Sequence, residues 1–312
     1  MRSPAGVLQR VVPAVRERDV THAQRRLQAQ VAVTATVCAH IAGAGPVSAW
    51  DSLARELAHW REAARTPTFW LRDDDACRDT PALGRLFAAS ARHGVPLSLA
   101  VVPAALEPGL VTSVAQAPLV TVVQHGFAHV NHAPAGARAA ELGDDRAGAA
   151  VLGELAQGDA VLARAYGERY LHVLVPPWNR IGEAIVPQLA AAGYRGLSTF
   201  APRTAPAAAP GLAQCNAHVD PIAWRRGRAF VGDDAAVTRV VDHLAARREG
   251  RVDAGEPTGL LTHHLVFDDA AWAFVEALFA ATRAQGATWL DTRAAFGLAR
   301  GAAAPATCGR ST

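Results

Sequence analysis

From about residue 66 onward, the chain alternates between short apolar runs and longer amphipathic stretches. The short runs are rich in β-branched and aromatic residues and are bounded by Gly, Pro or polar residues, which predicts buried strands. They cover residues 68–72, 96–103, 119–126, 171–177, 194–200, 211–219, 258–265 and 287–292. The alanine-rich stretches between them have helical spacing and cover residues 80–94, 149–167, 181–194, 233–250 and 269–286.

The stretch 80–94 shows how such a helix is marked at both ends. Thr80 is a candidate N-cap, Pro81 suits the first turn, and Gly94 is a typical C-terminal stop. Strands that alternate with helices predict a parallel sheet with the helices outside. Seven or eight such units indicate a closed barrel rather than an open sheet. We expect the Pro/Ala-rich segment 201–211 to be a surface loop.

Composition excludes several classes of protein. The chain has 312 residues, half of them apolar, which is enough for one large barrel or two modest domains with a sizeable core. Its net charge is only +3 and its arginines are scattered, so no nucleic-acid partner is expected. No apolar run reaches the roughly 18 residues of a membrane span. The four cysteines are widely spaced and are expected to be free thiols.

The two ends of the chain fall outside the alternating pattern. We expect residues 1–50 to be a poorly ordered or over-extended N-terminal segment and residues 301–312 to be a disordered tail. Residues 31–49 imitate a signal peptide, because an apolar stretch follows arginines and ends in small residues. The long leader before it and His40 within it argue against cleavage. A cytoplasmic location is therefore favoured, and export is the alternative if 31–49 acts as a signal.

Chemically active residues follow the ends of several predicted strands. In a parallel barrel these ends meet at one mouth, where active sites are found, so five such clusters are hard to explain by packing alone. The clusters are Asp73 to Asp75, His125 with His129 and His132, the segment 176–180, His218 with Asp220, and His263 with His264.

The histidine pair predicts a metal site. His125 and His129 are four residues apart, so on a helical turn both imidazoles would face the same way. With one carboxylate from the aspartate run, they would make three protein ligands and leave a position for water. An adjacent carboxylate could take a proton from that water, whose pKa the metal lowers. The alternatives are an ordinary histidine pair and an aspartate loop that caps the following helix.

The order of these motifs over residues 66–296 resembles that of the polysaccharide deacetylase (NodB-like) family of carbohydrate esterases. The family's strand-ending Asp-Asp is similar to the run "RDDDA" at 72–76, and its His-x-x-x-His to 125–129. Its Arg-Pro-rich loop is similar to "VPPWN" at 175–179, and its Leu-x-His to 261–263. The resemblance implies an α/β fold, a distorted parallel (β/α) barrel with about seven strands, as one domain over residues 51–300.

The resemblance also implies roles for individual residues. Asp74 would be the catalytic base, Asp75 would bind the metal together with His125 and His129, and His263 would be the general acid. The aspartate run leaves the register open by one residue, with Asp73 as the structural member. The pair "HH" likewise leaves His264 as the alternative acid. The implied cofactor is a divalent metal ion, with zinc first and cobalt or nickel as alternatives.

Two departures from the family pattern mark a divergent branch. Val175 stands where the family has an arginine that orients the base, and Arg180 is a candidate to supply that charge. Ala223 precedes Trp224 where the family has an aspartate that tunes the acid, which leaves Asp220 as the nearest carboxylate.

The remaining candidates lie around these groups. Aromatic side chains, including Trp178, Trp224 and Phe127, could form walls against a sugar ring or could be ordinary core residues. We expect contacts to substrate or to the oxyanion from Pro177, Trp178, Asn179 and Arg180. Residues expected to support the site from behind are Asp73, His132, His218, Asp220, Trp224 and His264.

The function expected from this set is the metal-dependent hydrolysis of an N-acetyl or O-acetyl group on a carbohydrate. The metal would hold the attacking water, an aspartate would take its proton, and a histidine would protonate the leaving group. The expected partner is an acetylated amino-sugar glycan or oligosaccharide. The rival reading is a catalytically weakened protein of the same fold that binds metal or carbohydrate, and the two departures favour it. A metal phosphoesterase is disfavoured because no ligand set for a second metal is visible.

Overall fold

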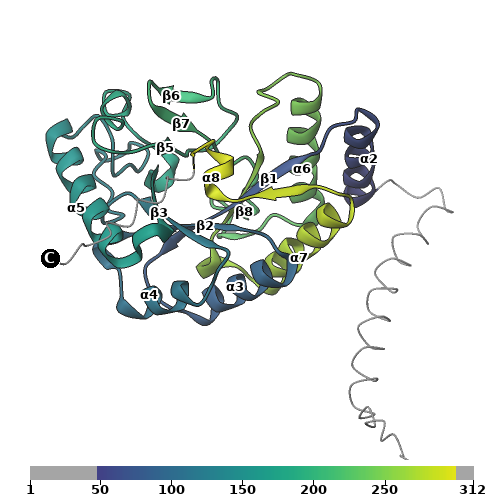
Figure 1. The fold of residues 1–312 in the computed structure, drawn as a ribbon, viewed down its shortest axis with the longest axis horizontal. Helices are drawn as coiled ribbons and strands as arrows, with labels where there is room; N and C mark the ends of the chain where they lie inside the picture. The colour runs from purple at the N-terminus through teal and green to yellow at the C-terminus, as the bar shows by residue number, and fades with distance from the viewer. Residues whose placement is uncertain (1–47, 300–312) are drawn as a thin grey trace, which may run out of the picture. The chain divides into compact units, whose positions relative to one another are not determined.

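The computed structural model describes residues 48–299, in which a parallel sheet is surrounded by helices (Figure 1). The sheet has nine strands, with the order β10-β1-β2-β3-β4-β5-β7-β6 and with β11 paired to β1 beside this path. The pairings of β10, β1, β2, β3, β4, β5 and β7 are all parallel, whereas β6 is antiparallel to β7. The predicted barrel of about seven parallel strands is therefore confirmed.

The strands of this sheet lie where the apolar runs predict them. Their bounds are β1 (Thr68–Ala76), β2 (Leu97–Val101), β3 (Val120–His125), β4 (Tyr170–Val175), β5 (Gly196–Leu197), β6 (Ala207–Ala209), β7 (Leu212–Gln214), β10 (Thr258–Thr262) and β11 (Thr288–Leu290). A separate hairpin is formed by β8 (Ile222–Ala223) and β9 (Ala229–Phe230).

No continuous ladder closes the barrel between β7 and β10. Residues that follow β7 occupy the gap, and isolated bridges join Ala217 to Phe200 on one side and Val219 to Leu260 on the other. The barrel is therefore closed only in part, which agrees with the expected distortion.

The two faces of each strand meet different surroundings, as the alternation of side chains requires. In β1, Phe69 and Leu71 pack with the helices in the main core. Trp70 belongs to a second cluster inside the barrel, together with Val173 and Phe296. The edge of Phe296 meets the ring of Trp70 at a centroid distance of 5.7 Å. The interior is thus filled by side chains and is not a pore.

The helices cover the outside of the sheet (Figure 1). They are α2 (Ala49–Glu62), α3 (Pro81–His93), α4 (Pro108–Ala115), α5 (Gly148–Tyr166), α6 (Asp233–Arg248) and α7 (Asp269–Ala284). The short helix α8 (Thr292–Ala295) instead packs on the cluster inside the barrel through Ala295. The caps of α3 are those predicted: the Thr80 side chain accepts from the Leu83 N–H, and Gly94 has a left-handed φ of 61°. Helix α2 packs on α6 outside the barrel.

Two predictions about elements are corrected. The helix expected over 181–194 is reduced to turns and one short 3-10 segment, Val186–Gln188, since Pro187 lacks the N–H that a continuous helix needs. Part of the expected surface loop 201–211 is the edge strand β6.

Predictions for residues 1–47 and 300–312, including the signal-like segment up to residue 47 and the tail, lie outside the described residues. Cys77 and Cys215 are free thiols, and Cys38 and Cys308 fall in those outer segments. Between residues 48 and 299, no helix is both long and apolar enough to cross a membrane.

Candidate metal centre and active site

The three consecutive aspartates point in three directions because β1 alternates and then bulges. Asp73 lies on the helix side of β1 and Asp74 on the barrel side, as neighbours in a strand must. The register against β2 then shifts by one residue between Asp73 and Ala76. Asp75 occupies this irregularity with a left-handed φ of 70°. The bulge turns its carboxylate toward the mouth instead of toward the helices.

Asp75 meets both histidines of the predicted pair. Its Oδ1 lies 3.1 Å from His125 Nε2 and 3.2 Å from His129 Nε2. The two imidazole centroids are 5.2 Å apart. The ligand atoms of these three residues all lie within 4.8 Å of one another. Two imidazole nitrogens and one carboxylate oxygen are the donor set expected of an open divalent-metal site.

The protonation of His125 suits a metal ligand. His125 ends β3 with its ring almost fully buried, and its Nδ1 lies 3.0 Å from the carbonyl oxygen of Val175. A carbonyl only accepts, so Nδ1 carries the proton and donates it. In the neutral ring the lone pair of Nε2 therefore faces Asp75 and is available to an ion, whereas in the charged ring this nitrogen carries a proton that Asp75 accepts. A hydrogen bond of this kind orients metal-bound histidines in proteins.

His129 reaches the centre from a loop, not from the helical turn that its spacing suggested. Residues 126–129 follow β3 without forming a helix, and His129 has a left-handed φ of 56°. The buried carboxylate of Glu141 accepts hydrogen bonds from the N–H groups of Phe127 and Ala128, at 3.2 and 2.7 Å. These bonds hold the loop in a conformation that the spacing of the histidines alone does not predict.

Charge in the centre is strongly coupled. Burial raises the pKa of Asp75, but hydrogen bonds from His125 and His129 outweigh it and hold that pKa well below its usual range. Burial lowers the pKa of His125, but the charges of Asp74 and Asp75 outweigh it and raise that pKa. Asp75 therefore keeps its negative charge, which a divalent cation would neutralise in place of the imidazoles.

Asp74 is held by an arginine from its own strand. Arg72 and Asp74 lie two residues apart on the barrel side of β1, and both are buried. Arg72 Nη2 donates to Asp74 Oδ2 at 3.0 Å, and Arg72 Nε lies 2.9 Å from Asp74 Oδ1 as an ion-pair contact without hydrogen-bond geometry, so the two side chains meet in a two-point contact. Arg72 also donates to the Asn179 side-chain oxygen at 2.6 Å and to Ser198 Oγ at 2.7 Å. The base expected from the sequence thus has a fixed cationic partner.

This arrangement corrects the expectation for Arg180. Its Nη1 donates to the carbonyl of Ala139 at 2.6 Å, and no contact with Asp74 is found. Arg72 supplies the charge beside Asp74 instead. Asn179 contacts Arg72, while the ring of Trp178 packs 4.4 Å from that of His129. Trp178 and Asn179 both have left-handed backbones, with φ of 55° and 57°, so the chain turns sharply after buried Pro177.

The adjacent histidines separate as strand alternation requires. His264 lies on the helix side, where its Nδ1 is 2.5 Å from Asp73 Oδ1 and its N–H donates to Asp73 Oδ2. His263 follows the last residue of β10 and lies close enough to Asp75 to lower its pKa. His263 Nδ1 is buried without a hydrogen-bond partner. The structure thus separates His263, on the side of Trp224 and the candidate metal centre, from His264, which pairs with Asp73 on the helix side.

Asp220 and Trp224 form the wall beside His263. Trp224 Nε1 donates to Asp220 Oδ2 at 2.7 Å, and its ring meets the His263 ring edge-to-face at 4.6 Å. Burial raises the pKa of Asp220, and the nearby charge of His263 opposes this rise. Asp220 therefore lies near His263, although Ala223 precedes Trp224.

Comparison with known proteins identifies the fold of this chain. No family model matches the sequence, and a search of the curated proteins gives no significant match. Among solved structures, a CE4 family pseudoenzyme from Bacillus anthracis is similar at 13% identity, over 75% of this chain and 66% of that chain, with a TM-score of 0.50. The chain has the fold of the CE4 polysaccharide deacetylases. The expected resemblance is confirmed at this level, and the low identity agrees with a divergent branch.

Two further solved structures are similar to a lesser degree. A peptidoglycan N-acetylglucosamine deacetylase is 14% identical over 77% of this chain and 96% of that chain, with a TM-score of 0.49. An acetyl xylan esterase of family 4 from Clostridium thermocellum was solved with a cobalt ion. It is 11% identical over 74% of this chain and 91% of that chain, with a TM-score of 0.48.

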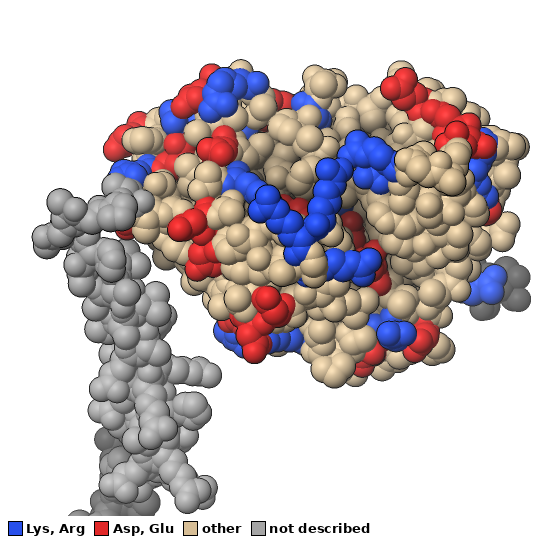
Figure 2. All heavy atoms as spheres, turned by 180° about the vertical axis from the view of Figure 1, so that it is seen from behind, with Lys and Arg blue, Asp and Glu red and all other residues tan. Residues whose placement is uncertain are grey.

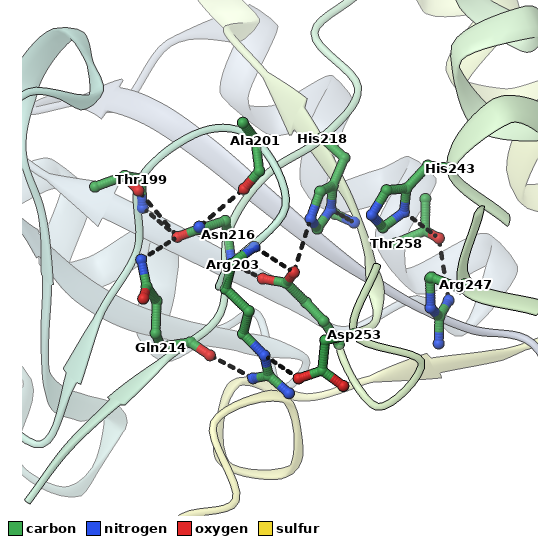
Figure 3. Close-up of polar contacts among 12 residues, drawn as sticks. Thr199, Ala201, Arg203, Gln214, Asn216, His218, His243, Arg247, Asp253 and Thr258 are labelled. Atoms are coloured by element: carbon green, nitrogen blue, oxygen red, sulfur yellow. Dashed lines mark hydrogen bonds and ion pairs between the residues drawn. The ribbon is translucent and has the colours of Figure 1, made fainter. Parts of the chain in front are cut away.

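Two residues expected to support the CE4-like site lie elsewhere. His132 is exposed, its backbone N–H donates to Ala140, and no contact with the metal centre is found. His218 belongs to a second buried group with His243 and Glu256, beside the first residues of β10 and not beside its end (Figure 3). Strand alternation could not place either residue, since both follow irregular segments.

Sequence reasoning missed Arg72 and Glu141. Arg72 stands two residues before Asp74 in a strand, and that spacing was the available signal. Glu141 had no signal, because its loop folds back over residues 126–128 from a distance along the chain.

Proposed function

We propose that this chain is a metal-dependent hydrolase that removes N-acetyl or O-acetyl groups from a carbohydrate. The observation that carries the proposal is the meeting of Asp75, His125 and His129 at the barrel mouth, with Asp74 and His263 beside them. Two nitrogens and one oxygen suit a borderline ion, so zinc is proposed, with cobalt or nickel as alternatives. Such an ion, when bound, supplies a Lewis acid that polarises the acetyl carbonyl and makes water a better nucleophile.

The chain's own groups divide the proton transfers. Asp74 accepts the proton of the attacking water, and the two-point contact from Arg72 fixes the direction of its carboxylate. His263 gives a proton to the leaving amine or alcohol, since its ring lies at the centre and its Nδ1 has no competing partner. The backbone N–H groups near Pro177 and Trp178 are proposed as donors to the oxyanion.

The walls of the site suit a sugar. Trp178 packs against His129 on one side and Trp224 against His263 on the other. Both rings thus flank the reacting groups, and Trp224 is 41% exposed, so its face is open to a ligand. The apolar faces of a pyranose stack well on such rings.

The second candidate is a protein of this fold without turnover. The solved structure with a TM-score of 0.50 is itself described as a pseudoenzyme, so the fold alone does not imply catalysis. The Arg72–Asp74 contact favours the enzyme, because it restores the arginine that the sequence lacks at Val175.

Acetate release from N-acetylated chitooligosaccharides, with added zinc or cobalt and with metal content measured in parallel, tests the proposal. Asp74→Asn should keep the metal and lose about 10²- to 10⁴-fold of the activity, because it removes the proton acceptor and not a ligand. Equal loss of metal would mean that Asp74 is a ligand. Metal binding without acetate release from any acetylated saccharide would favour the second candidate.

A further inference from the structure

Both walls of the mouth carry arginines. On one wall, Arg180 follows Trp178 in the loop after β4 and donates to the carbonyl of Ala139, which places its guanidinium beside the neighbouring Arg138. On the other wall, Arg225, Arg226 and Arg228 lie in the hairpin that follows Trp224. The Arg228 guanidinium carbon is 6.0 Å from the Trp224 ring centroid. We call these five residues the arginine rim.

The two halves of the rim face each other. Burial lowers the pKa of Arg180, and the charges of Arg138 and Arg225 lower it further. Arg180 and Arg225 lie in different loops, 45 residues apart along the chain, and the charge of one acts on the other. In the view of Figure 2, basic side chains gather around a hollow in one face, with acidic side chains inside it.

The rim lacks carboxylate partners. Within residues 48–299, none of its five arginines forms a salt bridge. Arginines elsewhere do so: Arg146 pairs with Glu154 and Arg203 with Asp253. Gathering unpaired like charges costs free energy in the absence of an anion, and the guanidinium fork matches the oxygens of carboxylate, sulfate and phosphate.

We propose that the arginine rim binds an anionic substituent of the substrate, so that the acetylated saccharide carries a carboxylate, sulfate or phosphate group. This inference rests on the proposed function for its position beside the reacting groups. The carboxylates deeper in the site each have a partner: Asp74 pairs with Arg72, Asp73 with His264, and Asp75 with His125 and His129. An anion at the rim therefore meets arginines first, while the acetyl group of an adjoining sugar reaches the centre between Trp178 and Trp224.

Calorimetric binding to the full zinc-loaded chain tests the inference with matched saccharides. The probes are chitotetraose, a hyaluronan tetrasaccharide with uronate carboxylates, and N-acetylglucosamine beside its 6-sulfate and 6-phosphate. Anionic probes should bind about tenfold or more tightly than the neutral probe of matched length at low ionic strength. This advantage should shrink at about 0.5 M salt, since exposed charges are then screened. The carboxylate, sulfate and phosphate arms show which anion the rim prefers.

Charge removal at the rim gives the second readout. Arg180→Gln and Arg225→Gln should each weaken the binding of anionic probes about fivefold, an effect of the size expected for exposed charge pairs. The binding of neutral probes should weaken less. The matched control is Arg164→Gln, which removes an exposed arginine near the far end of α5, just before β4 begins. This control variant should bind both the anionic and the neutral probes as tightly as the wild type.

Two results would overturn the inference. One is equal or weaker binding of the anionic probes; the other is equal loss for both classes of probe in the rim variants, which would mean that the rim only balances the acidic interior. Failure of the proposed function looks different, because it appears as missing metal or missing acetate release while the binding preference can still be measured.

Discussion

Within residues 48–299, two groups of two histidines and one carboxylate lie at opposite ends of β10. The mouth cluster is Asp75, His125 and His129; the rear cluster is His218, His243 and Glu256. Both groups bring their ligand atoms within 4.8 Å of one another. By residue type and spacing in the fold, they are equally good candidates for a metal.

The position of one proton separates the two clusters. In the mouth cluster, His125 Nδ1 donates to a carbonyl, so Nε2 of the neutral ring keeps a lone pair. In the rear cluster, His218 Nδ1 accepts from the Gly259 N–H at 2.9 Å, so in the neutral ring the proton sits on Nε2. Nε2 lies 3.2 Å from Glu256 Oε2. His218 therefore carries a proton where a metal ligand would need a lone pair.

The rear cluster instead ties chain segments across the gap in the barrel (Figure 3). Buried Glu256 accepts from the backbone N–H groups of Asn216 and Arg203, at 2.8 and 2.9 Å, as well as facing His218. These contacts join the loop before β10 to segments on either side of the incomplete ladder. The difference teaches that a metal centre is defined by where the protons lie, not by which residues gather.

The largest expected effect separates the two histidines that follow β10. His263→Ala should lose about 10²- to 10⁴-fold of acetate release at unchanged metal content, because it removes the proposed general acid from the mouth. His264→Ala should act mainly on stability, since it leaves the buried Asp73 carboxylate without its imidazole partner, a type of change that costs about 3–5 kcal/mol. Acetate release, metal content and urea unfolding of both variants distinguish them. If His264→Ala is folded and inactive while His263→Ala is active, the acid is His264.

The next largest expected effect is on metal binding, and it compares the two clusters directly. His129→Ala removes one of three ligands and should weaken metal binding by more than the about 10- to 100-fold that loss of an outer hydrogen-bond partner costs. His243→Ala, its counterpart in the rear cluster, should retain the full metal content of the wild type. Metal analysis after dialysis against a buffered zinc solution measures both. Loss of metal in the His243 variant alone would reverse the assignment of the two clusters.

Strand alternation and motif order predicted most of the mouth, and they failed where the chain is irregular. Asp74 and His263 lie on the barrel side and His264 on the helix side, as counting along β1 and β10 requires. Asp75 reaches the mouth only because of a bulge, and His129 only because Glu141 holds a loop, so its helical-turn rationale was wrong. The rear cluster had no sequence signal, because it joins α6 to segments that precede and flank β10.

A smaller effect concerns Glu256. Glu256→Gln keeps the shape of the side chain but replaces one carboxylate oxygen by an amide N–H₂, which faces a backbone N–H donor. The hydrogen bonds that the backbone N–H groups donate to a charged acceptor are therefore lost. We expect a loss of about 2 kcal/mol in the free energy of unfolding, with metal content unchanged. The control is Glu249→Gln on the surface, which should leave the stability nearly unchanged. Urea unfolding of the two variants gives the comparison. A metal-depleted Glu256 variant of normal stability would contradict the structural role.

The effect that is smallest near neutral pH, and grows only as the pH falls, is the pH dependence that the rear cluster adds to stability. Burial, the neighbouring His218 and the charge of Arg247 lower the pKa of His243 to about 2, and burial also lowers that of His218. An unfolded chain takes up protons on these rings below about pH 6.5, whereas the folded chain does not. Their contribution to stability is therefore complete above pH 6.5 and is lost as the pH falls toward the folded pKa.

For His243 this loss should reach about 1.4 kcal/mol per pH unit below pH 6. The contribution of His264 to stability depends on pH in the opposite direction. Burial lowers the pKa of His264, but Asp73 outweighs burial and raises it. The contribution of His264 is therefore complete below pH 6.5 and fades as the pH rises. Comparing wild type with His243→Asn isolates the rear cluster from this background. Urea unfolding between pH 6.5 and 4.5 should show a shallower fall in the free energy of unfolding for the variant. Equal slopes would mean that His243 is protonated in the folded protein, and that the contrast between the two clusters is wrong at this residue.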